Sequence, residues 1–229
     1  MKKKFTLIIG WLYLVATVTG CLNSNTNDKP IISTNAKVSF THASPDCPDL
    51  MVSIDEASIS TSAISYKDYT GYLDVSSGVR NMKFKSAVDG ALLVNATNTF
   101  ADNKIYSAFV ITSGLTFEMW IVDDTGTLTN IDNCMVRVVH ASPDAPPVKF
   151  VLLGESATLP SHSFKQVSDF KELTAKTYTI EIRAESDNHL ILSSPFNPQA
   201  GAFYTVALFG FTTPPLNNTH GLEIMITKN

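Results

Sequence analysis

Hydrophobic and polar residues alternate along several short stretches of the chain. In residues 178–183 (YTIEIR) every second side chain is apolar, and residues 81–85 (NMKFK) repeat the pattern around Met82 and Phe84. A period of two is that of a β-strand with one face in a core and the other in water. The alternation therefore predicts strands at both positions.

Further short apolar runs are separated by Gly, Pro, Asn and Asp, and no long segment shows a helical stripe. Seven or eight such strands per hundred residues are typical of an antiparallel sandwich. The runs are 105–112 (IYSAFVIT), 117–124 (FEMWIVDD), 203–211 (FYTVALFGF) and 222–229 (LEIMITKN). We therefore predict an all-β fold of immunoglobulin-like sandwiches.

The chain repeats itself at an offset of 98 residues. This shift places His42 on His140 and Asp46 on Asp144 without a gap, within the shared string HASPD. A repeat of this length indicates two tandem domains. The predicted organisation is an export signal at 1–20, a tether at 21–35, a first sandwich at 36–122, a linker at 123–133 and a second sandwich at 134–229.

The first twenty residues have the pattern of an export signal. Three lysines precede an apolar run over residues 5–18, and the segment ends in VTGC at Cys21. Small residues before a cysteine resemble the bacterial lipobox, in which the cysteine is lipidated after cleavage. Since the run is shorter than the ~20 residues that cross a bilayer, we predict lipidation at Cys21 rather than a transmembrane anchor. The expected location is the bacterial cell envelope, anchored by lipid to the outer membrane.

The composition and net charge of the chain limit the classes of partner that it can bind. The chain is 44% hydrophobic and 17% charged, which suits globular domains. Without the three lysines of residues 1–20, the 17 basic residues fall to 14 against 21 acidic ones, a formal charge of −7. This charge argues against a nucleic-acid partner. The membrane is then contacted only through the N-terminal lipid, across a tether rich in Asn, Ser and Thr.

These motifs together resemble one known family. The strand VRVVHASPDAPP at 136–147, the segment GYL at 71–73, the strand YTIEIR and the later strand AFYTVA at 202–207 are similar to the family called domain of unknown function 4397. The resemblance covers nearly the whole mature chain in two copies. It implies secreted or lipid-anchored β-sandwiches, and the family name implies no activity.

HASPD is most simply a turn that each sandwich needs. The histidine continues the apolar phase of its strand, so a partly buried imidazole needs hydrogen-bond partners. Ser-Pro-Asp is a natural turn, because Pro fixes φ while Ser and Asp bond backbone amides. The predicted structural residues are His42, Ser44, Asp46, His140, Ser142 and Asp144.

The alternative interpretation makes His140 and Asp144 a metal or acid–base pair. One histidine and one acid per copy fall short of the three or four protein ligands of a zinc site, and no calcium loop is present. The remaining histidines, His162, His189 and His220, have no counterparts in the first copy. We expect them in solvated loops and expect no metal and no cofactor.

Catalytic motifs are also missing from the sequence. SDFK at 168–171 and SDN at 186–188 match pieces of a penicillin-recognising serine enzyme, but KTY at 176–178 has the wrong order and lacks the glycine. No metalloprotease, phosphate-loop or nucleophile-elbow motif occurs. We therefore expect a non-catalytic binding or structural module for a glycan or protein ligand. The alternatives are a carbohydrate-binding lipoprotein and, with less support, a hydrolase.

Aromatic residues and cysteines supply the remaining candidates. Tyr72 and Phe170 are equivalent in the repeat and are assigned to the cores, which leaves Tyr69 and Phe211 as candidates for exposed ligand contact. Once Cys21 is acylated, two thiols remain, at Cys47 and Cys134. A disulfide between them would brace the two sandwiches, provided that the strand count brings the linker to the same end as the first HASPD turn.

Overall fold

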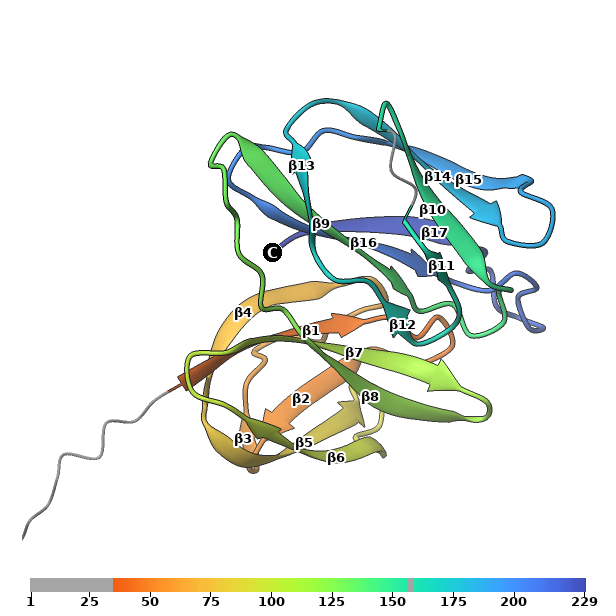
Figure 1. Ribbon diagram of the computed structural model, residues 1–229. Coiled ribbons are helices and arrows are strands. Elements are labelled where there is room, and N and C mark those ends of the chain that lie inside the picture. Colours follow the sequence, from red (N-terminus) through yellow and green to blue (C-terminus); the bar gives the residue numbers. More distant parts are fainter. Residues whose placement is uncertain (1–34, 156–158) are drawn as a thin grey trace, which may run out of the picture. The chain divides into compact units, whose positions relative to one another are not determined.

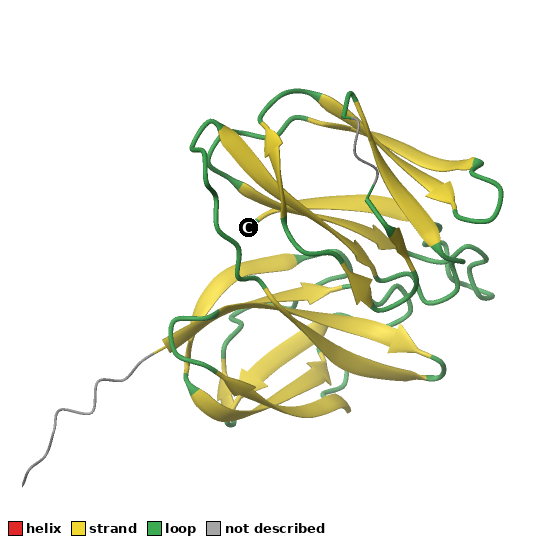
Figure 2. Ribbon diagram, in the orientation of Figure 1, coloured by secondary structure: helices red, strands yellow, loops and turns green. Residues whose placement is uncertain are grey.

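The computed structural model describes residues 35–155 and 159–229, and residues Ser33–Asn229 form one compact unit. The predicted export signal, Cys21 and the tether before Asn35 lie outside the described residues. The described part contains strands and loops only (Figure 2). Within it, no helix is long and apolar enough to cross a membrane.

The first sandwich is built from eight strands in two sheets, in the orders β4-β1-β7-β8 and β3-β2-β5-β6 (Figure 1). These strands are β1 (Asn35–His42), β2 (Leu50–Ile54), β3 (Ala57–Ser58), β4 (Tyr69–Ser76), β5 (Gly78–Ser86), β6 (Leu92–Phe100), β7 (Ile105–Ser113) and β8 (Thr116–Asp123).

The second sandwich repeats this plan with the sheets β12-β9-β16-β17 and β11-β10-β14-β15, and β13 also pairs with β9. Its strands are β9 (Asn133–His140), β10 (Val148–Leu153), β11 (Ser161–His162), β12 (Gln166–Val167), β13 (Lys171–Thr174), β14 (Tyr178–Ala184), β15 (Leu190–Phe196), β16 (Phe203–Phe209) and β17 (Glu223–Lys228). The predicted fold class of two tandem β-sandwiches is therefore confirmed.

One strand pair in each sandwich departs from the antiparallel rule. β1 runs parallel to β7, and β9 runs parallel to β16. The first strand of each copy thus lies between an antiparallel neighbour from the middle of that copy and a late strand that runs parallel to it along its other edge. Both edges of β1 and β9 are covered in this way, which removes unpaired backbone groups from the middle of the sheet.

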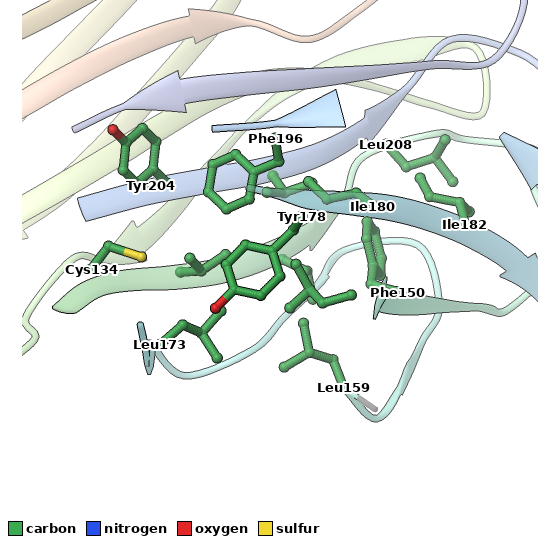
Figure 3. Close-up of a cluster of buried hydrophobic side chains, with 14 of the residues drawn as sticks. Cys134, Phe150, Leu159, Leu173, Tyr178, Ile180, Ile182, Phe196, Tyr204 and Leu208 are labelled. Carbon is green, nitrogen blue, oxygen red and sulfur yellow. The ribbon is translucent and has the colours of Figure 1, made fainter. Parts of the chain in front are cut away.

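Each sandwich has its own core. The first core includes Phe40, Met82 and Phe84, all 1% exposed or less. The second includes Phe150 and Ile180 and lies between β10, β14 and β16 (Figure 3). Burying each of these large side chains contributes about 1.5–3 kcal/mol. The alternating strands β5 and β14 supply Met82, Phe84 and Ile180, as their period of two predicts.

Four strands do not have the expected wet face. β1, β7, β9 and β16 are buried along most of their length on both sides. Their outward side chains form a third apolar cluster that contains residues of both sandwiches, which we call the interdomain cluster: Ala43, Phe109, Ile111, Val122, Val139, Ala141, Ala207 and Phe209. The one-wet-face expectation was wrong for these strands because the two sandwiches pack sheet against sheet.

Candidate functional site

The first HASPD turn is tied together by its own side chains. The Ser44 amide donates to Nδ1 of His42 at 3.4 Å, so the ring proton is on Nε2. Nε2 then donates to the Pro48 carbonyl at 3.1 Å, across the turn. His42 is 1% exposed, and this burial lowers its pKa below 6.5. The neutral imidazole therefore acts as a fixed link between the end of β1 and the start of β2.

The acid of the first turn bonds to the last residues of a neighbouring strand. Asp46 accepts hydrogen bonds from Ser44 Oγ at 3.1 Å and from the Thr112 hydroxyl of β7. Ser44 and Thr112 are themselves in contact at 2.5 Å. The turn after β1 is thus attached to the end of β7, the strand that pairs with β1 in parallel.

The second HASPD turn is also attached to the end of the parallel neighbouring strand, but other groups donate the hydrogen bonds. His140 Nε2 bonds to the Pro146 carbonyl at 3.2 Å, and burial lowers the pKa of His140. Ser142 donates to the Gly210 carbonyl at 2.6 Å. Asp144 accepts from the amides of Thr212 and Thr213 at 2.7 and 3.0 Å. In both copies, each of these side chains bonds within its own sandwich.

Neither turn gathers the side chains of a metal site. Within residues 35–155 and 159–229, no three His, Cys, Asp or Glu side chains are grouped so that they could hold an ion. The Nδ1 atom of His140 is buried and has no hydrogen-bond partner in that part of the chain. One unpaired nitrogen offers a single ligand atom, which is fewer than zinc requires.

The bridge between Cys47 and Cys134 does not form, and both cysteines are buried free thiols. Cys47 belongs to the core of the first sandwich and Cys134 to that of the second. The topology explains the separation. β8 runs antiparallel to β7 and therefore to β1, so the linker leaves the first sandwich at the end opposite the HASPD turn.

The aromatic candidates also take places other than those expected. Phe211 is 7% exposed, because its backbone bridges to Gly221 and the chain folds over it. Tyr69 is half-buried against Tyr72, with ring centroids 6.4 Å apart, and burial raises its pKa. Neither residue is an exposed contact. Among the histidines expected in solvated loops, His162 is buried instead and packs on the Phe150 ring at 6.0 Å.

Tyr72 and Phe170 were assigned to the cores, but both are half-buried between the sandwiches. They line the same cavity, of about 470 Å³. Tyr72, Ile105, Phe170 and Phe203 supply its apolar walls, and Asn103 and Lys104 are among its polar residues. Phe170 and Phe203 meet edge to face, with ring centroids 5.3 Å apart.

Gly126 leaves room for the two phenylalanine rings, because it has no Cβ atom. A Cβ atom on Gly126 would lie 2.9 Å from Phe203 Cε1 and 3.2 Å from Phe170 Cδ2. Any larger residue must therefore displace the rings. A second cavity of about 550 Å³ is lined by Trp120, Arg137 and Phe170 and shares Gly126 with the first.

A buried ion pair lies beside these cavities. Arg137 Nη1 is 2.6 Å from Asp124 Oδ1, and both side chains are 1% exposed. Arg137 also donates to Thr205 and Ser107, each at 3.0 Å, and its guanidinium lies 4.8 Å from the centroid of the Phe170 ring. Arg137 of the second sandwich thus binds residues of both sandwiches.

Asp124 is equally well surrounded. Its Oδ2 accepts from Tyr72 Oη and Ser107 Oγ, both at 2.6 Å. Burial, followed by the nearby Asp124 charge, raises the pKa of Tyr72 far above its usual value. Its hydroxyl therefore stays protonated and donates. A buried ion pair is stable only when further hydrogen bonds satisfy it, and this network supplies them.

Sequence reasoning missed this network. Arg137 alternates with Val136 and Val138, which places it on the face expected to be wet, and Asp124 was assigned to the linker. One signal was available. Residues 105–112 and 203–211 are apolar almost without interruption, and continuous apolar runs are typical of strands buried on both faces.

A family model described as domain of unknown function (DUF4397) matches the chain twice, over residues 36–151 and 134–222. The two matches overlap where β9 and β10 carry the fuller HASPD motif. No curated protein matches the chain.

Proposed function

Because the chain belongs to the family described as domain of unknown function (DUF4397), whose description names no activity, we propose a function from its own residues. The protein is an exported, lipid-anchored envelope protein that acts without catalysis as a binding module. Its ligand site is the aromatic cavity where the two sandwiches meet. The cavity is the observation that carries this proposal.

The walls and rim of the cavity suit a small organic ligand. Pockets of about 300–1,000 Å³ with apolar walls and a few polar groups are the usual binding sites for small molecules. Here three aromatic rings provide the walls. At the rim, the Lys104 ammonium lies 3.1 Å from Thr125 Oγ1 and 3.7 Å from Asp123. The rings are rigid, so little conformational entropy is lost when a ligand packs on them.

Two acids line the cavity, the exposed Asp102 and the buried Asp124, and the buried one supports binding better than hydrolysis. A general base needs a lone pair directed at the substrate. Asp124 lines the cavity, but its carboxylate already accepts from Tyr72 and Ser107 and is paired with Arg137. It is therefore committed to the protein itself.

A carbohydrate is the second candidate, and the mixture of rings and polar groups favours it. A sugar presents apolar C–H faces to aromatic rings and hydroxyls to the rim. Tyr72, Phe170 and Phe203 offer the rings, while Asn103 and Lys104 offer an amide and an ammonium. The Arg137 cation on Phe170 opposes a cationic ligand on the same ring.

The binding proposal can be tested with the fragment Ser33–Asn229, which contains all the described strands and cores. Saturation-transfer NMR against a fragment library that includes methyl glycosides of neutral hexoses reports ligands whose C–H groups touch the protein. Gly126→Ala should weaken binding by about tenfold or more, since displaced rings fill the cavity. Gly221→Ala is the matched control, because a Cβ there meets nothing within 4 Å.

The outcomes separate the two candidates. Binding of neutral glycosides that is lost in Gly126→Ala supports the carbohydrate site. Binding of other molecules alone, with the same loss, supports the binding module and rejects the carbohydrate. If no compound binds, or if Gly126→Ala and Gly221→Ala behave alike, the cavity is not a ligand site.

The lipid anchor rests on the basic start, the apolar run and VTGC ending at Cys21. Several acyl chains would make attachment effectively permanent, at about 0.8 kcal/mol per buried methylene. Metabolic labelling with a palmitate analogue should mark the wild type and not Cys21→Ser. Equal labelling of the two proteins would contradict the anchor.

A further inference from the structure

The faces that meet between the sandwiches consist of equivalent positions. The offset of 98 residues relates β1 to β9 and β7 to β16. Both members of the pairs Ala43 and Ala141, and Ile111 and Phe209, lie in the interdomain cluster. Each sandwich therefore uses the same surface to contact the other.

Strand register extends the equivalence to the last strand of each copy. Tyr106 pairs with Asp123, and the equivalent Tyr204 pairs with Lys228. Asp123 is thus equivalent to Lys228. The residues that follow, Asp124 and Asn229, are equivalent as well.

Ion pairs at the edge of the interface are reciprocal. Lys67 contacts Glu223 at 2.8 Å, and Lys165 contacts Glu118 at 3.0 Å. Lys67 is equivalent to Lys165, and Glu118 is equivalent to Glu223 by the strand register. When residue i of one unit contacts residue j of the other and the reverse also holds, the interface is isologous, as in a two-fold dimer. This surface is therefore self-complementary.

The centre of the interface breaks that symmetry in charge. Arg137 is equivalent to Ser39, and Asp124 is equivalent to Asn229, so each charge of the buried pair occurs in one copy only. Thr205 bonds to the uncharged Asn229 at 3.2 Å, as its equivalent Ser107 bonds to Asp124 at 2.6 Å. The hydroxyl residue and its partner thus occupy equivalent positions in both copies, but the partner carries a charge only in the first.

The aromatic residue beside each charge also differs between the two copies. The Tyr72 hydroxyl donates to Asp124 at 2.6 Å. The equivalent residue Phe170 has no hydroxyl and instead lies 4.8 Å from the Arg137 guanidinium. The first sandwich is thus built to hold a carboxylate and the second to hold a guanidinium.

We propose that Arg137 and Asp124 form a pairing code, which makes the first sandwich bind the second and prevents either from binding another copy of itself. Two first sandwiches joined through this surface would bury two Asp124 carboxylates without a cation. Two second sandwiches would bury two Arg137 guanidiniums without an anion. An unpaired buried charge is strongly destabilising, and such repulsive elements produce specificity between similar partners.

The test uses the full Ser33–Asn229 unit with a protease site inserted after Gly126, in the exposed linker. The folded protein is cut, the halves are allowed to exchange in mild denaturant, and native mass spectrometry counts the dimers after dilution. The wild type should give only the pair of unlike halves. The double variant Arg137→Ser/Asp124→Asn, which copies each equivalent residue, should also give both like pairs, with unlike pairs falling to about half.

Single variants sharpen the result. Arg137→Ser should permit pairs of second halves and still forbid pairs of first halves, and Asp124→Asn should do the reverse. Lys67→Ala/Lys165→Ala is the control, since these exposed ion pairs contribute little, and it should keep the wild-type preference. Like pairs from the cut wild type, or unlike pairs alone from every variant, would overturn the pairing code. Like pairs from the cut wild type would overturn the pairing code even where a variant does not fold.

Discussion

At the scale of single residues, the HASPD histidines join a strand to the turn that follows it. His42→Ala and His140→Ala each remove the hydrogen bond to a proline carbonyl and leave a cavity at a buried site. Each should lower the free energy of unfolding by about 1–3 kcal/mol. Urea denaturation measures the change, with the exposed His189→Ala as control. Variants at His42 and His140 that are no less stable than the His189→Ala control would contradict the structural role of the motif.

The same histidines give stability a dependence on pH. Burial lowers the pKa of His42, His140 and His162 in the folded state, so the unfolded chain binds protons first as the pH falls. Their contribution is fully present above the unfolded value of about 6.5 and decreases below it. The free energy of unfolding should therefore fall between about pH 7 and pH 5.

Carboxylates act in a lower pH range. Hydrogen bonds from Thr129 and Asn133 hold the pKa of Glu172 at about 2, so its contribution is present above the ordinary glutamate value of about 4.3 and is lost as the pH falls from there to about 2. A plot of the free energy of unfolding against pH should be flatter between about pH 7 and pH 5 for the double variant His42→Ala/His140→Ala than for the wild type. An unchanged slope would show that other groups titrate there.

The turn residues of the HASPD motif could be predicted from the sequence because their chemistry is local. Pro, Ser and Asp favour a turn at the end of a strand, and the repeat places the same residues there in both copies. Arg137 could not be predicted in the same way. Its burial depends on a surface that is distant in the sequence, and a period of two does not distinguish a face in water from a face against another domain.

At the scale of elements, Gly210 joins the end of β16 to the loop beyond it. Its φ is +82°, and a Cβ there would lie 2.0 Å from the Gly221 carbonyl oxygen. Gly210→Ala should destabilise the fold by more than about 3 kcal/mol, because the alanine is strained at this positive φ and the Gly221 backbone must also move away from its Cβ atom. Gly90→Ala is the matched control, with φ of +75° and open space, and should cost about 1–2 kcal/mol. Equal melting temperatures for the two variants would contradict the close contact.

The strands themselves were predictable, and their pairing was less so. Alternation identified β5 and β14 and the side chains they bury. It did not show that β1 pairs in parallel with β7, because parallel and antiparallel neighbours leave the same pattern of side chains on a strand. Cys47 and Cys134 illustrate the consequence, since only the direction of β8 places them at opposite ends.

At the scale of the whole molecule, the interdomain cluster and the Arg137 network should make the two sandwiches unfold together. Separating them would expose Phe109 and Phe209 to water and would break the buried ion pair between Arg137 and Asp124. Calorimetry of Ser33–Asn229 should show one transition with equal calorimetric and van't Hoff enthalpies. Arg137→Ala should cost about 3–5 kcal/mol and separate the transition into two. Two transitions in the wild type would show that the sandwiches are independent.

The parallel pairing of β1 with β7 also sets an order of events for a chain that is synthesised from its N-terminus. Lys37 lies beside Ile105 in the sheet, so one side of β1 has no partner until the ribosome has released the chain as far as Ser113. The same delay recurs in the second copy, where β9 waits for β16. Contacts between residues so far apart form slowly, and an open strand edge invites wrong pairing. Each half of this protein therefore passes through a stage of synthesis in which its first strand needs protection, and the second half reaches that stage with a finished template already beside it.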